Sequence, residues 1–98
     1  MKEELAILAE SLEGAVPGQL FGKPSLKLGK AHFACGFQQC LVVKVGKEAI
    51  EDMLPGFEGS LLFDPSGKGR PMKDWLQIPE TFKDQWPSLA RQALDFVK

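Results

Sequence analysis

The amino-acid sequence predicts a single α+β domain in which an antiparallel sheet carries helices on one face. Segments whose apolar residues recur every three or four positions begin and end the chain, and a shorter one lies in the middle. Segments of alternating pattern come in runs joined by turn residues, which is typical of antiparallel hairpins. At 98 residues the chain is long enough for one hydrophobic core. The predicted order is helix, three strands, helix, two strands, helix, in one domain, 1–98.

The first helix is predicted over Lys2–Glu13, because leucines recur there at helical spacing and glutamates fill the other face. Gly14 ends it. The first strand is predicted to enter irregularly at Pro17-Gly18 and to continue through Leu28. Pro24 lies inside this strand and therefore indicates an edge strand or a bulge.

The next two strands are predicted to form a hairpin, Ala31–Phe37 followed by Leu41–Val45, after a turn at Gly29-Lys30. The aliphatic residues of the second of these strands meet Phe33 only if the loop holds an odd number of residues, three or five. This register pairs Phe33 with Val43 and Cys35 with Leu41. It places Cys40 on the face opposite Cys35, so that no disulfide is expected.

The remaining elements are a short helix, a second hairpin and a C-terminal helix. Lys47–Leu54 has the composition of a helix, and Pro55-Gly56 closes it. Strands at Ser60–Phe63 and Met72–Ile78 are joined by a long, polar, glycine-rich loop that we expect to be flexible. The last helix has an apolar stripe, which is Phe82, Trp86, Leu89, Ala93 and Phe96 or Val97.

Composition and charge exclude several classes of protein. The formal net charge is -1, so no global field attracts the chain to nucleic acid or to an anionic membrane. The N-terminal segment interleaves carboxylates with apolar residues, unlike a signal peptide, and no stretch has the length of a membrane span. Two cysteines are too few for a disulfide framework. We therefore expect a cytoplasmic protein.

The residues with catalytic or metal-binding chemistry are few and scattered. His32 is the only histidine, and the sequence places no partner beside it for catalysis. His32, Cys35 and Cys40 are suitable ligand types, but a fourth zinc ligand is missing, and strand alternation puts His32 and Cys35 on opposite faces. We therefore predict no enzyme activity, no metal and no cofactor.

The glycine-rich loop offers a weak signal for anion binding. Gly67–Arg70 could present backbone amides and two cations to a phosphate group, although the spacing of a nucleotide-binding loop is absent. The candidate residues for contact with an anion or a nucleic acid are Lys68, Arg70 and Lys73.

From Pro17 onward the sequence resembles the N-terminal domain of the TfoX (Sxy) competence regulators, within a wider grouping that includes YjbR-like proteins. The segments that carry the resemblance are Leu20-Phe21-Gly22, His32-Phe33-Ala34, Leu41-Val42-Val43-Lys44-Val45, Met72-Lys73-Asp74-Trp75 and Leu76-Gln77-Ile78-Pro79. The resemblance implies an architecture similar to that of type III secretion chaperones. It also implies a non-enzymatic role in transcriptional regulation or competence. Leu20 departs from the family's usual methionine, and the second, helical domain of the full-length regulators has no counterpart in this sequence.

Three functional hypotheses remain open. The first is a regulatory or protein-interaction module, homodimeric through a sheet face or edge. Its far sheet face, with His32, Ala34, Val42 and Lys44, is where a partner is expected to dock. The second is a nucleic-acid-binding module that uses strand and hairpin cations, namely Lys23, Lys27, Lys30, Lys68, Arg70 and Lys73. The third is a chaperone-like or small-molecule-binding domain, which requires a concave pocket.

Overall fold

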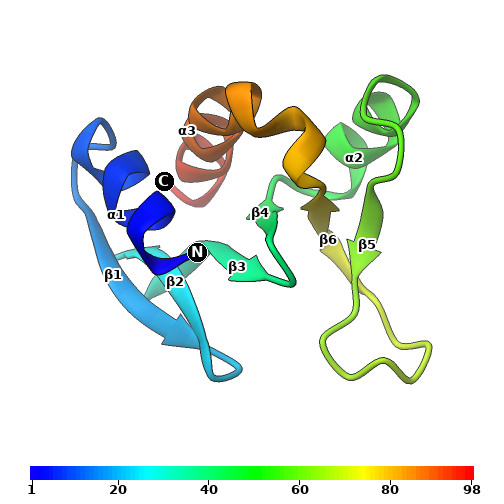
Figure 1. Ribbon diagram of the computed structural model, residues 1–98, viewed down its shortest axis with the longest axis horizontal. Helices are drawn as coiled ribbons and strands as arrows, with labels where there is room; N and C mark the ends of the chain where they lie inside the picture. Colours follow the sequence, from blue (N-terminus) through cyan, green and yellow to red (C-terminus); the bar gives the residue numbers. More distant parts are fainter.

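The computed structural model describes all 98 residues, Met1–Lys98, and confirms the α+β class. Three α-helices and two 3-10 helices accompany a six-stranded antiparallel sheet (Figure 1). The strands number one more than predicted. In chain order the elements are α1 (Lys2–Glu10), β1 (Ala15–Leu20), β2 (Lys23–Leu28), β3 (Ala31–Phe37), β4 (Cys40–Lys44), α2 (Lys47–Met53), η1 (Leu54–Gly56), β5 (Leu61–Phe63), β6 (Met72–Ile78), η2 (Glu80–Gln85) and α3 (Trp86–Val97).

The additional strand arises because the first predicted strand is a hairpin. β1 and β2 pair antiparallel, with Leu20 opposite Lys23, so the turn holds only Phe21 and Gly22. Both turn residues have positive φ, 53° and 72°, as a two-residue turn of type I′ requires. Phenylalanine rarely occupies such a position, and for this reason the sequence pattern did not indicate a turn there.

The sheet has the strand order β1-β2-β3-β4-β6-β5, so β1 and β5 are its edges. All three α-helices pack on one face of it, which we call the helix-covered face (Figure 1). The core between them draws mainly on α1, α3 and the four central strands, β2, β3, β4 and β6. The other face, which we call the open face, has a second apolar cluster to which no helix contributes, made of Cys35, Val42, Phe63 and Trp75.

A β-bulge in β3 changes the predicted faces of Ala34 and Cys35. The β2–β3 register shifts between Leu26 and Lys27, so that β3 has one residue more than its partner. Phe33 and Ala34 are consecutive, yet both belong to the core beneath the helices. His32 and Cys35, predicted on opposite faces, therefore share the open face. Ala34, predicted on the far face, lies fully buried on the helix-covered face.

The β3–β4 loop is shorter than predicted. Phe37 pairs with Cys40 and Ala34 with Val43, so the loop consists of Gln38 and Gln39 alone. The predicted pairs Phe33 with Val43 and Cys35 with Leu41 are therefore wrong. Phe33 nevertheless shares the core with Val43. The extra residue of the bulge and the even number of loop residues each reverse the predicted alternation of faces, and the two changes cancel. Cys40 consequently lies on the same face as Cys35, and both thiols are free.

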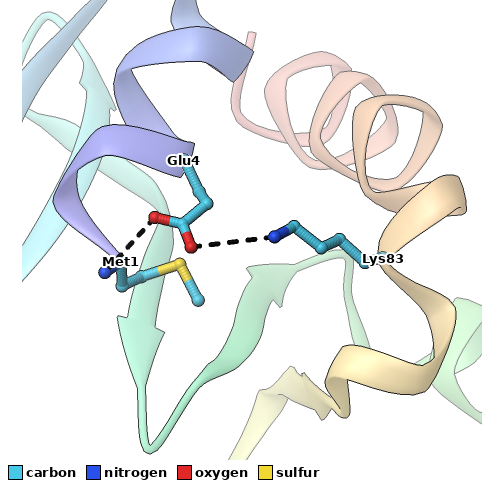
Figure 2. A network of polar contacts seen from close by, with 3 residues as sticks. All are labelled: Met1, Glu4 and Lys83. Atoms are coloured by element: carbon cyan, nitrogen blue, oxygen red, sulfur yellow. Dashed lines mark ion pairs between the residues drawn. The ribbon is translucent and has the colours of Figure 1, made fainter.

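The C-terminal helix is joined to the sheet through η2. Trp86, the first residue of α3, is 2% exposed and part of the main core, and Phe82 in η2 packs edge-on against Phe57. Figure 2 shows how η2 also meets α1. The Glu4 carboxylate forms ion pairs with the Met1 ammonium at 3.4 Å and with Lys83 Nζ at 3.8 Å. None of the helices has the length and apolar character needed to cross a bilayer.

Candidate functional site

The sheet curls across the open face, so that its first hairpin meets the edge strand β5. The ring of Phe21, in the β1–β2 turn, lies 6.4 Å from that of Phe63 in edge strand β5. Phe63 also contacts Phe37 at 5.4 Å and Trp75 at 6.3 Å, measured between ring centroids. This contact across the curl explains why Val42 and Phe63 are fully buried although no helix covers them.

Exposed apolar side chains mark the rim of the open face. Phe21 is 55% exposed although it packs on Phe63. Leu61, which pairs with Gln77 at the β5 edge, is 62% exposed. Two exposed large apolar side chains therefore lie at separate positions of this face, one at the hairpin turn and one at the β5 edge.

Three lysines lie among these apolar groups. Lys23 places its ammonium over the Phe37 ring, 5.5 Å from the centroid. Lys44 pairs with Trp75, and their side chains therefore project from the same face. The side chains of Lys27 and His32 both lie over Gly18, since a Cβ atom placed on Gly18 would be within 3.4 Å of each of them. The open face is therefore cationic as well as apolar.

Carboxylates are absent from this part of the sheet. Between Ala15 and Lys44 the sequence has no Asp or Glu, whereas most acidic residues lie on the helices and the segments that join them. The two carboxylates near β5 and β6 accept hydrogen bonds from backbone N–H groups, Asp74 from Lys47 at 3.1 Å and Asp64 from its own loop. The molecule therefore has an acidic helix layer and a basic sheet face despite a net charge of -1.

His32 has a partner that the sequence analysis missed. Its Nδ1 lies 2.9 Å from Ser25 Oγ, within hydrogen-bonding distance. A serine and histidine pair can provide a nucleophile, but Ser25 is only 2% exposed and its hydroxyl is out of reach of a substrate. The pair instead satisfies a buried hydroxyl beside the bulge. The sequence gives little indication of this pair, because Ser25 and His32 meet only when β2 and β3 pair.

The two cysteines have structural surroundings. Burial raises the pKa of the Cys35 thiol to about 12, so that it stays protonated and unreactive at neutral pH. Cys40 is partly exposed, and its sulfur accepts a hydrogen bond from Gln77 Nε2 at 3.7 Å. No group of three or more His, Cys, Asp or Glu side chains is close enough to hold a metal ion.

The glycine-rich loop already encloses an anion, the carboxylate of Asp64. This carboxylate accepts hydrogen bonds from the Ser66 hydroxyl at 2.7 Å and from the backbone N–H groups of Gly67, Gly69 and Arg70 at 3.0–3.2 Å. The amides predicted to meet a phosphate are therefore occupied. The side chains of Lys68, Arg70 and Lys73 remain exposed around the loop.

The predicted contact residues of the far face divide into three environments. His32 and Lys44 are partly exposed on the open face, Val42 is buried beneath the aromatic rings of that face, and Ala34 belongs to the opposite face. The prediction missed Phe21 and Leu61, and it named Lys23 and Lys27 only as possible nucleic-acid contacts. The absence of acidic residues from Ala15 to Lys44 was the signal in the sequence that could have indicated this face.

Comparison with known proteins identifies no relative. No family model matches the chain, and no curated protein or solved structure matches it either.

Proposed function

We propose that this domain is a non-enzymatic protein-interaction module that binds an acidic segment of a partner protein on the open face. The observation that carries the proposal is the combination of exposed Phe21 and Leu61 with a carboxylate-free basic surface. A partner that fits it presents carboxylates to Lys23, Lys27 and Lys44 and an apolar side chain to the rim. Charge complementarity of this kind promotes association and excludes basic partners.

A protein segment fits the open face better than a nucleic acid does. Base stacking requires exposed aromatic faces, and here Trp75 and Phe63 are buried against other rings. On the open face, only Phe21 has an exposed ring. The lysines are partly buried and spaced around an apolar rim, whereas phosphate binding favours a continuous basic stripe. The resemblance of the sequence to the TfoX N-terminal domain implies a non-enzymatic regulatory role, with which a protein-binding surface is compatible.

A peptide titration tests the proposal. The probe is a synthetic peptide of alternating Glu and Leu or Phe, and its controls are the same peptide with Lys in place of Glu and a single-stranded DNA oligonucleotide. Amide resonances of β2, β4 and the Phe21 turn should shift with the acidic peptide alone. Affinity should fall as ionic strength rises, because the contacts are electrostatic and partly exposed.

A matched pair of charge reversals identifies the face. The double variant Lys23→Glu/Lys44→Glu should weaken peptide binding at least about tenfold, because attraction becomes repulsion. The control, Lys47→Glu/Lys98→Glu, changes the net charge equally at exposed positions of the helix layer and should bind like the unmodified protein. Equal losses in both variants would contradict the proposal. Tighter binding of the oligonucleotide would favour the nucleic-acid alternative instead.

A further inference from the structure

A groove lies away from the open face, between α1 and the β1–β2 hairpin. It is an open groove of about 660 Å³, within the range of roughly 300–1,000 Å³ that is usual for small-molecule sites. The groove exists because the residues that α1 and the hairpin present to each other are small or rigid. Ala6 and Ala9 leave space on the helix, and Pro17 and Pro24 supply short, stiff rings on the hairpin.

The groove has an apolar floor and one charged end. Leu5 and Leu26 lie at its base and are almost fully buried. Lys2 is the only charged residue that lines it, and it makes no ion pair. Since Lys2 and Ala9 are seven residues apart on one helix, the groove extends about 10 Å along α1 from this cation.

From this arrangement we propose that the groove binds an amphipathic monoanion, a medium-length alkyl chain with a carboxylate head. The chain lies along Ala6 and Ala9 over the leucine floor, and the carboxylate meets the Lys2 ammonium. The absence of any Asp or Glu among the lining residues favours an anion over a cation at the charged end. The Gln19 amide, on the facing strand, is available as a further donor.

The proposal is independent of partner binding on the open face, because it uses the opposite side of the β1–β2 hairpin. The side chains of Lys23 and Lys27 project from one face of β2, and Pro24 and Leu26, which alternate with them, line the groove. Loss of one site therefore leaves the other testable.

Titration with decanoate below its micelle concentration, followed by amide chemical shifts, tests the groove in the full chain. We expect saturable shifts confined to α1 and the β1–β2 hairpin, and weaker binding of decanol and of decyltrimethylammonium. Lys2→Glu should weaken decanoate binding about fivefold, as expected for one partly exposed ion pair. Ala6→Trp should abolish it by filling the groove, and Ser88→Trp on the exposed side of α3 should have no effect.

Each alternative result overturns a stated part of the proposal. Equal binding of decanol and decanoate would show an apolar site without anion recognition. Shifts spread over the whole domain, or binding that survives Ala6→Trp, would show that the groove is not the site. Thermal unfolding of each variant without ligand verifies that it is folded before binding is compared.

Discussion

Asp64 shows how one side chain organises a long loop. The hydrogen bond from the Ser66 hydroxyl, and then those from the Gly69, Arg70 and Gly67 amides, hold the pKa of this carboxyl below its usual value. A carboxyl group whose pKa is lower in the folded state stabilises the protein above its unfolded pKa. That stabilisation is lost as pH falls through the folded pKa.

Asp64→Asn should therefore destabilise the domain at neutral pH and have a smaller effect as the solution is acidified through the pKa of the folded carboxyl. Urea unfolding of both proteins across the acid range measures the difference. Asp95→Asn is the control, because Asp95 is exposed and pairs only with Lys98. A pH-independent difference between Asp64→Asn and the unmodified protein would show that the carboxylate charge does not stabilise the loop.

Trp86 tests the contribution of a single core side chain. It is 2% exposed, and its indole N–H has no hydrogen-bond acceptor. Trp86→Ala should lower the free energy of unfolding by about 3–5 kcal/mol, because it empties a large volume of the core. Trp86→Phe should cost less, since it keeps a ring and removes an unpaired donor. Chemical denaturation measures both, and a loss below about 1 kcal/mol for Trp86→Ala would mean that α3 is anchored elsewhere.

At the level of elements, the β3–β4 turn uses residues poorly suited to its conformation. Gln38 and Gln39 both have positive φ, 50° and 64°, where asparagine and glycine are favoured. Replacing them by Asn-Gly should raise the free energy of unfolding by about 1 kcal/mol, because the left-handed conformation costs a non-glycine residue roughly that much. Urea unfolding measures the gain. Destabilisation would show that the loop does not form the two-residue turn.

The bulge in β3 gives a sharper test of which face each residue occupies. Ala34→Leu should destabilise the domain by about 1–3 kcal/mol, because Ala34 is fully buried beneath the helices. Lys44→Leu, on the open face, should have little effect on stability. If Ala34→Leu were the tolerated change, Ala34 would lie on the exposed surface and the bulge would be absent.

At the scale of the whole molecule, the contact between Phe21 and Phe63 closes a sheet whose edges are far apart in strand order. Phe21→Ala should cost only about 1 kcal/mol, since its ring is more than half exposed. It should nevertheless increase amide hydrogen exchange in β1, because the hairpin loses its contact with β5. Hydrogen-exchange mass spectrometry measures this change, and unaltered exchange would show that the curl does not depend on the aromatic contact.

The features of this protein that sequence patterns could predict are those that depend on neighbours along the chain. Helical spacing of Leu5 and Leu8, proline and glycine at Pro55-Gly56, and the period of two in β4 each reflect local geometry, and they predicted the helices, most strands and the α+β class.

The features that no local pattern carries are those set by packing between distant segments. The bulge at Phe33 buries two consecutive residues beneath the helices, and the turn at Phe21 places its ring against Phe63 across the curled sheet. Pairing energies between strands, not propensities along them, bring Lys23, Lys44 and Leu61 to one surface, and the candidate site therefore became visible only in three dimensions.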